Sequence, residues 1–420
     1  MNQSQQLFLD ILKEAIQNRA YKENISAYPW EDILKLAQIH KVLPLVFDEV
    51  CRLPEMISLI QESSFLQKYQ MVSVREAAEQ MIRHDQFLRF YQKLQGKGIH
   101  PCIVKGMVVS RLYPKPCYRP SVDEDILIDE QDFSVCHAFM KEQGLSLLDP
   151  AQNLGDHEVA YCAKNGYLYI EVHKALFDPE AKAYGQLSHV FRDVENRIIT
   201  EELPLYSEPN HEIQIHTLHP TDHMLYLILH AYKHFLYSGF GIRQVCDINL
   251  FAFTYQDKID WGYINKILAE NNALIFTNAI WKIGANWLGF EWTEIDPELD
   301  ESMLLNDIME SGLYGSSTMA RLHSSNITLE AVSDNLQHGA ASRGGIPYIF
   351  QSVFPPYDSL KNRYAFLQKV PFLLPVAWLM RIGSYTKEIL SGKKGVSEVS
   401  ESVKLGQQRI ELLKKYGMIK

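Results

Sequence analysis

Two aspartates, Asp123 and Asp125, lie one residue apart in the segment VDEDILID, whose apolar residues are typical of a β-strand. Side chains two positions apart on a strand point to the same face, so both carboxylates would project to one side of a sheet. Two such carboxylates repel each other unless a cation lies between them. Hard oxygen ligands of this kind suit Mg²⁺, which usually takes one or two carboxylates together with substrate phosphates and water.

A third carboxylate, Glu171, lies in the later strand-like segment LYIEVH, where Tyr169 and His173 share its face by the same rule. Glu171 could complete a site for one or two divalent ions, Mg²⁺ or Mn²⁺. Such a site would serve phosphoryl or nucleotidyl transfer, because the metals neutralise a triphosphate and stabilise the leaving pyrophosphate. One of the carboxylates could also help to deprotonate the acceptor.

A small α/β unit over residues 97–175 would position these carboxylates. HPCIVKG is a short β-type segment ended by a glycine, and MVVSRLY suggests a short helix after it. Residues 130–144 form an amphipathic pattern closed by Gly144 in the position that follows a helix. LSLLD, HEVAYCAK and YLYIEVHKAL are strand candidates, and Asn165-Gly166 between the last two predicts a hairpin.

Helices are predicted on both sides of this unit, where apolar residues recur every three or four positions. We expect an N-terminal helical region over 1–95, the α/β core over 96–210 and a C-terminal helical region over 211–420. Thr221 is predicted to cap the first C-terminal helix. Residues 310–350, richer in Ser, Gly and Asn, are predicted as a long loop. The fold class is therefore α+β, with a small mixed sheet flanked by helices.

Composition limits the classes of partner. The 420 residues carry 41 Lys and Arg against 51 Asp and Glu, a formal net charge of −10. A field of this sign disfavours non-specific attraction to nucleic acid or anionic membranes, so a nucleotide would need local cations, backbone N–H groups or a metal. The six cysteines are scattered without a CxxC pair, and no secretory signal is recognisable. We predict a cytoplasmic protein.

The longest apolar segment, residues 370–380, has 11 residues and includes two prolines. A membrane-spanning helix needs about 20 apolar residues. No integral membrane association is therefore predicted, and contact with a membrane interface near Trp378 remains an open alternative.

The order of several motifs resembles the bacterial family described as uncharacterised nucleotidyltransferase, within the polymerase-β-type superfamily. The motifs in this chain are Lys105-Gly106, Tyr113-Pro114, Arg119-Pro120, Asp123-Glu124-Asp125, Glu171-Val172-His173, His230 with His234, Arg243 with Asp247, Phe354-Pro355, Arg363-Tyr364 and Leu373-Leu374-Pro375.

The resemblance implies a nucleotidyltransferase-type core that moves a nucleoside monophosphate from an NTP such as ATP to an unidentified acceptor. A small molecule or a protein is favoured over extended nucleic acid because of the acidic charge. Asp123, Asp125 and Glu171 would be the metal ligands and catalytic residues. Gly106 would open the phosphate-binding turn, and the other predicted nucleotide contacts are Lys105, Arg119 and Lys233.

The residue between the two aspartates is normally apolar in this superfamily, and here it is Glu124. A buried carboxylate costs several kcal/mol unless it is paired or protonated. Glu124 must therefore lie on a partly wet face or meet a cation such as Arg119 or Lys105. Two other hypotheses remain open: a catalytically inactive binding or scaffold protein that has kept the fold, and a peripheral membrane-associated biosynthetic protein.

His223, His230 and His234 fall on one helical face, at spacings of seven and four residues. Two histidines four residues apart can hold zinc, but the segment HAYKH lacks the glutamate of the HExxH motif. We favour a structural or substrate-side role over a zinc site. Asp247 is predicted to pair with Arg243 one helical turn away. No GxxxxGK[ST] or GxSxG motif is present, which disfavours a P-loop NTPase and a serine hydrolase.

Overall fold

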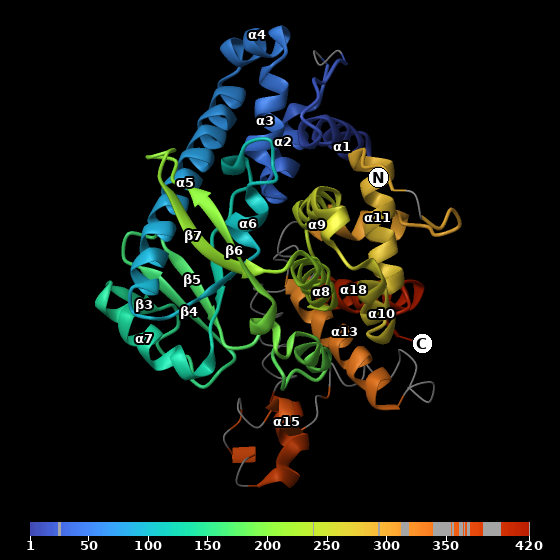
Figure 1. The fold of residues 1–420 in the computed structure, drawn as a ribbon. Helices are drawn as coiled ribbons and strands as arrows, with labels where there is room; N and C mark the ends of the chain where they lie inside the picture. The colour runs from blue at the N-terminus through green and yellow to red at the C-terminus, as the bar shows by residue number, and fades with distance from the viewer. Residues whose placement is uncertain are drawn as a thin grey trace.

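The computed structural model describes residues 1–23, 27–237, 239–292, 295–311, 319–338, 354, 357–360, 364, 366–367, 370–380 and 396–419. Within them a mixed sheet of seven strands is flanked by helices, which confirms the predicted α+β class (Figure 1). The helices are α1 Gln3–Ile16, α2 Trp30–Ile39, α3 Leu43–Cys51, α4 Pro54–Glu62, α5 Ser64–Gln95, α6 Gly106–Ser110, α7 Phe133–Glu142, α8 Pro220–Tyr237, α9 Ile242–Tyr255, α10 Trp261–Glu270, α11 Leu274–Leu288, α12 Ser302–Ser311, α13 Met319–His338, α15 Tyr357–Leu360 and α18 Val396–Lys415.

The strands follow the spatial order β3-β4-β5-β2-β1-β7-β6. β2 pairs with β5 in parallel, β1 pairs with β7 in parallel, and the other neighbours are antiparallel. Their bounds are β1 Cys102–Val104, β2 Glu124–Leu127, β3 Leu145–Leu147, β4 Glu158–Ala163, β5 Tyr169–His173, β6 Ile198–Pro204 and β7 Glu212–Leu218. The three motifs therefore meet at the centre of the sheet, β5-β2-β1. Lys105-Gly106 directly follows β1, Asp123-Glu124-Asp125 begins one residue before β2, and Glu171-Val172-His173 lies in β5.

Two large apolar cores lie on either side of this sheet. One joins α5 and α7 to the face that carries Ile103, Ile126 and Val172. The other joins the N-terminal helices and α8 to α12 to the opposite face, which includes Cys102 and Val104. Figure 1 shows α5 and α7 on one side of the strands and α8, α9 and α11 on the other. Because alternate residues of a strand point to opposite faces, β1 and β2 contribute to both cores, whereas β5 contributes Ile170 and Val172 to the first core and carries Glu171 and His173 on its other face.

Several expected elements are present where the sequence pattern placed them. β4 and β5 form the predicted antiparallel hairpin, with Gly166 at φ +73° in the turn. Gly144 follows α7 with φ +81°, a conformation that L side chains rarely adopt.

Other expectations were wrong. β6 and β7 form a hairpin that the pattern did not predict, and β7 extends the sheet beside β1. The segment 319–338, expected within a long loop, is helix α13, while residues 339–350 lie outside the described part. Thr221 does not cap α8, which begins at Pro220. Its hydroxyl instead accepts the backbone N–H of Asp260 at 3.0 Å and so ties α8 to the start of α10.

The buried His40 gives a pH-dependent prediction. His40 follows α2, is fully buried and stacks on Phe8, and burial lowers its pKa from 6.5 to about 4. The unfolded chain therefore binds a proton near pH 6.5, whereas the folded chain binds it only near pH 4. The free energy of unfolding that results from keeping His40 neutral is fully present above pH 6.5 and is lost as the pH falls toward 4.

We expect His40→Gln to lose less free energy of unfolding than the wild type between these two pH values, as measured by urea unfolding. His100→Gln, at an exposed position, is the control and should keep the wild-type pH dependence. Equal losses in wild type and His40→Gln would contradict the assignment of a neutral buried imidazole.

Candidate active site

The structure brings two of the three predicted carboxylates together. In the parallel register of β2 and β5, Asp125 lies opposite Glu171. His173, two positions further along β5, shares their face. One ligand atom from each of these three residues lies within 4.8 Å of the others. The adjacent strands therefore assemble a group of side chains able to hold one cation.

Asp123 lies immediately before β2 and lines the same cavity of about 260 Å³ as Asp125 and Glu171. The Ser121 hydroxyl donates to the Asp123 backbone carbonyl at 3.0 Å, which fixes the entry into the strand. Asp123 stands outside the three-residue group. Its negative charge nevertheless reaches the site, because it contributes to the raised pKa of Glu171.

A cation from the chain itself lies beside these carboxylates. Lys105, which follows β1 with φ +56°, places its ammonium 3.0 Å from Asp125 Oδ1 and 3.1 Å from His230 Nε2. Asp125 Oδ1 is also 2.9 Å from His173 Nε2. Burial alone would lower the pKa of Lys105, but the Asp125 carboxylate holds it above its usual value. In this structure Lys105 is the cation that the paired carboxylates require.

The two facing carboxyl groups differ in protonation. Burial favours the neutral form of Asp125, but Lys105 and the hydrogen bond with His173 hold its pKa well below the usual range. Burial, followed by the charges of Asp125 and Glu158, raises the pKa of Glu171 to about 9. Asp125 is therefore ionised at neutral pH while Glu171 keeps its proton, because one ammonium cannot compensate both carboxylates.

The turn between β1 and α6 holds Gly106 against the Glu124 side chain. Gly106 has φ +35°, and a Cβ at this position would collide with the Glu124 carboxylate. Glu124 is 6% exposed, and its Oε2 has no hydrogen-bond partner among the described residues. Burial raises the pKa of Glu124 to about 8, against the opposing charge of Arg119. The strand face is therefore dry, and the raised pKa keeps Glu124 largely protonated at neutral pH, which lowers the cost of burying it.

Arg119 belongs to a buried polar cluster behind the turn. Its guanidinium donates two hydrogen bonds of 2.7 Å to the two carboxylate oxygens of Asp247, and a third of 3.2 Å to the Gly106 carbonyl. Tyr113 donates to Asp247 at 2.7 Å. The predicted partner of Asp247 was Arg243, which lowers the Asp247 pKa through its charge and donates to the Pro120 carbonyl. Arg119 and Tyr113 hydrogen-bond Asp247 directly, and the Arg119–Asp247 pair ties the turn to α9.

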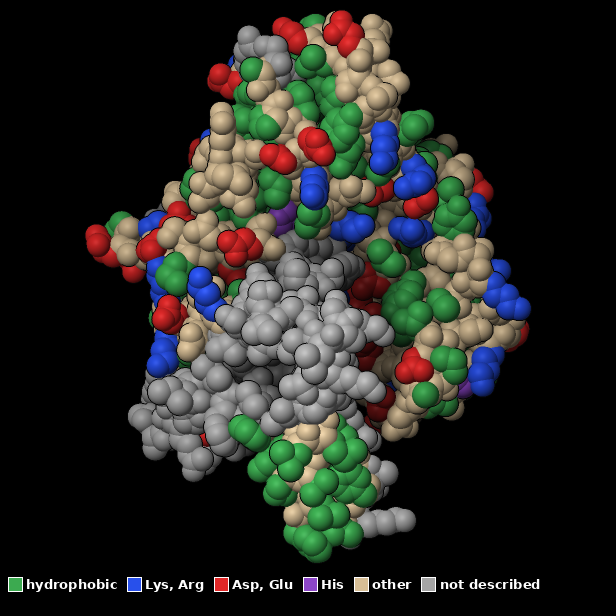
Figure 2. Space-filling model, turned by 180° about the vertical axis from the view of Figure 1, so that it is seen from behind, with side chains coloured by type: hydrophobic (Ala, Val, Ile, Leu, Met, Phe, Trp, Pro, Cys, Tyr) green, Lys and Arg blue, Asp and Glu red, His purple; other side chains and the backbone are tan. Residues whose placement is uncertain are grey.

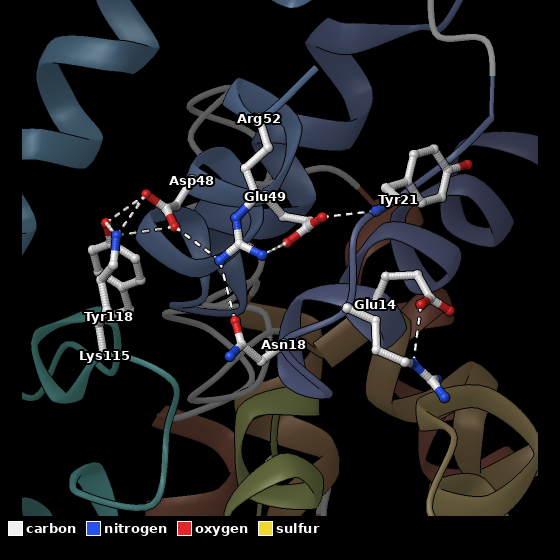
Figure 3. A network of polar contacts seen from close by, with 9 residues as sticks. Glu14, Asn18, Tyr21, Asp48, Glu49, Arg52, Lys115 and Tyr118 are labelled. Atoms are coloured by element: carbon white, nitrogen blue, oxygen red, sulfur yellow. Dashed lines mark hydrogen bonds and ion pairs between the residues drawn. The ribbon is translucent and has the colours of Figure 1, made fainter.

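Polar contacts anchor the segment between α6 and β2 on helix α3 (Figure 3). Asp48 accepts from Lys115 Nζ at 3.0 Å and from the Tyr118 hydroxyl at 2.7 Å. Arg52 pairs with Glu49 at 2.9 Å on the same helix. These contacts are partly exposed, so they orient the segment more than they stabilise the fold.

Helix α5 holds the end of the same segment. The Gln80 side chain accepts the backbone N–H of Ser121 at 2.8 Å, and Arg83 donates to the Ser121 carbonyl at 2.9 Å. The stretch from Gly106 to Asp123 joins the turn after β1 to the start of β2. The N-terminal helices fix both its middle and its end, and so place Asp123 at the cavity.

The histidine-rich face of α8 forms the opposite wall of the cavity. His223 Nε2 accepts the backbone N–H of Lys105 at 3.1 Å, and His230 and His234 approach each other to 3.3 Å between their Nε2 atoms. Burial lowers the pKa of His230 well below 6.5 and that of His234 to about 3, so both rings are neutral. Lys233 lines the cavity as well, and burial lowers its pKa.

Two residues of the site were not assigned a role from the sequence. His173 hydrogen-bonds Asp125, and Glu158 Oε2 lies 3.7 Å from His173 Nδ1. The Glu-x-His pattern already placed His173 on the face of Glu171, so a signal existed for it. Glu158 lies on β4 and reaches the site only through the antiparallel pairing with β5.

A model of the family described as uncharacterised nucleotidyltransferase matches residues 26–289, more than half of the 420-residue chain. The chain belongs to this family. The matched range includes all seven strands and the cavity residues named above. No curated protein and no solved structure matches the chain.

The Arg119–Asp247 pair gives a second prediction. Breaking a buried ion pair by removing one partner typically costs about 3–5 kcal/mol, because the other charge is left uncompensated. We expect Arg119→Met and Asp247→Leu each to lower the free energy of unfolding by about this amount. The double variant should lose clearly less than the sum, as urea unfolding of all four proteins would measure. Additive losses would show that the two side chains act independently.

Proposed function

We propose that this chain is a metal-dependent nucleotidyltransferase of the polymerase-β type, which moves a nucleoside monophosphate from an NTP to an acceptor. One observation carries the proposal. In a chain of the nucleotidyltransferase family, Asp125 and Glu171 face each other on adjacent parallel strands, at a cavity that also holds Asp123 and Lys105.

The residues present fit a divalent ion. Asp125 and Glu171 supply carboxylate oxygens on one face, and Asp123 lines the same cavity. Oxygen donors of this kind suit Mg²⁺ or Mn²⁺. His173 would orient Asp125 through their 2.9 Å hydrogen bond, as residues behind a metal ligand commonly do. When bound, such an ion neutralises triphosphate charge and stabilises the leaving pyrophosphate.

The side chains of the cavity supply the rest of the chemistry. The acceptor oxygen attacks the α-phosphorus, the bond from that phosphorus to the pyrophosphate oxygen breaks, and the acceptor proton passes to Glu171. Glu171 is protonated without ligands, with a pKa of about 9. A divalent ion held beside Glu171 would lower this pKa, so that Glu171 would release its proton to solvent and could then accept the proton of the acceptor.

The cations of the cavity have different roles in this proposal. Lys105 and Lys233 both line the cavity and can meet phosphate oxygens. When a nucleotide binds, the Lys105 ammonium would leave the Asp125 carboxylate and contact a phosphate oxygen instead. Arg119 lines the cavity too, but its guanidinium already donates to Asp247 and Gly106. Arg119 therefore contributes by holding the turn in place for the nucleotide.

A second candidate is a nucleotide-binding protein without catalysis. The observation in its favour is Glu124, whose carboxyl group lies against Gly106 at the turn that the superfamily uses for phosphate. A phosphate bound at this turn would have to displace Glu124. The two candidates differ in one measurable event, the release of pyrophosphate.

We expect different behaviour from two variants that replace a carboxyl group by an amide. Glu171→Gln should keep or raise the melting temperature of the ligand-free protein, because folding no longer forces a carboxyl group to take up a proton at neutral pH. Asp125→Asn should lower it, because Lys105 is left buried beside a neutral amide. Both variants should show a smaller thermal shift with Mg²⁺ and NTP than the wild type. A ligand at a hundredfold excess over its Kd stabilises the folded state by about 2.7 kcal/mol.

The matched control is Glu142→Gln, at an exposed position on α7, which should keep the wild-type shift. A wild-type protein without any Mg²⁺-dependent shift for the four common NTPs would overturn the nucleotide-binding proposal. A shift without pyrophosphate release over a range of acceptors would support the non-catalytic candidate.

A further inference from the structure

An exposed apolar surface lies far along the chain from the cavity, on the short 3₁₀ turn Pro371–Leu373 and the helix that continues to residue 380. We call it the 371–380 surface. Four large apolar side chains are exposed there: Phe372 at 81%, Leu379 at 69%, Met380 at 51% and Val376 at 42%. In the described part of the chain, no other ten-residue segment exposes four large apolar side chains at this level.

The surface is supported from beneath by a small core of its own. Leu360, Leu367 and Ala377 form a buried group separate from the two large cores, and Trp378 packs edge-on against Phe354 at 5.4 Å between ring centroids. Figure 1 shows this part, near α15, projecting from the body of the protein. Figure 2 shows the end of the projection covered largely by apolar side chains. The apolar residues are thus presented outward on a projection.

The sequence around this surface is basic in an otherwise acidic chain. Residues 357–395 include two acidic residues, Asp358 and Glu388, and seven basic residues. The basic residues are Lys361, Arg363, Lys369, Arg381, Lys387, Lys393 and Lys394. These seven lie outside the described residues. A local net charge of +5 (seven minus two) contrasts with −10 for the whole chain.

Exposed apolar side chains within a basic stretch of sequence are typical of segments that bind a membrane surface. Segments that lie in a membrane interface combine Phe, Leu and Trp on one side with Lys and Arg nearby, and each basic residue adds about 1 kcal/mol of attraction to anionic lipid. A protein partner would more commonly receive apolar anchors in a preformed pocket. In the described part of the chain no helix is long and apolar enough to cross a bilayer.

We propose that the 371–380 surface binds the face of an anionic lipid bilayer, with Phe372 and Leu379 inserted among the lipids and the net positive charge of the surrounding sequence favouring anionic headgroups. Association of this kind is peripheral and reversible. It would hold the active-site cavity near a membrane. The proposal does not depend on the nucleotidyltransferase activity.

The test is co-sedimentation of the full-length protein with vesicles of phosphatidylcholine alone and of phosphatidylcholine with phosphatidylglycerol. We expect binding at least tenfold stronger to the anionic vesicles, and a marked loss of binding in high salt. Phe372→Ser combined with Leu379→Ser should lower binding to the anionic vesicles at least tenfold. Because both side chains are exposed, circular dichroism should show an unchanged fold.

The matched control is Met71→Ser combined with Val74→Ser on α5, which removes two apolar side chains exposed at 68% and 64%. This variant should bind vesicles as the wild type does. The proposal is overturned by absence of wild-type binding to anionic vesicles, by an equal loss in the control, or by a wild-type dimer that Phe372→Ser dissociates. A dimer of that kind would mean that a second copy covers the surface. The Mg²⁺–NTP thermal shift should be the same in both double variants, so failure of nucleotide binding would be recognised separately.

Discussion

The buried contact between the Lys105 ammonium and the Asp125 carboxylate is the interaction on which the site depends. Asp125 lies in the middle of the sheet at 2% exposure, where an uncompensated negative charge would cost several kcal/mol. Lys105 supplies the opposite charge from the neighbouring strand, in a backbone conformation with φ +56°. Because the ammonium neutralises Asp125 and not Glu171, the two carboxyl groups acquire different pKa values and can take different chemical roles.

The same lysine joins the sheet to the helical wall. Its backbone N–H is bound by His223 and its ammonium lies beside His230, both on α8. The neutral state of these histidines follows from their burial, and a neutral ring can accept a hydrogen bond from the lysine. The histidine-rich helix face therefore acts as a support for Lys105. Arg119 and Asp247 make a second connection of this kind, between the turn and α9.

Local sequence patterns were sufficient for the elements that carry the site, but not for its assembly. Alternation along a strand placed Asp123 and Asp125, and Asn165-Gly166 predicted the hairpin that presents Glu171. The adjacency of β2 and β5 depends on pairing between distant segments, which periodicity does not report. The same limit explains why β7 beside β1, and Arg119 as the partner of Asp247, were missed. Glu124 was anomalous in the strand pattern because its close approach to Gly106, which lacks a Cβ, is a property of the folded turn.

Helix α1 lies outside the residues that match the family, but its side chains belong to the folded core. The family match begins at residue 26, yet Phe8, Ile11 and Leu12 of α1 are fully buried in the core that also contains α8 and α11. Gln17 donates to the Leu288 carbonyl at 3.0 Å, across 271 residues of sequence. A fragment cut at the limits of sequence similarity would expose this apolar interface. Cooperative folding therefore extends beyond the region in which relatives are recognisable, and the first helix behaves as part of the core although its sequence lies outside the family pattern.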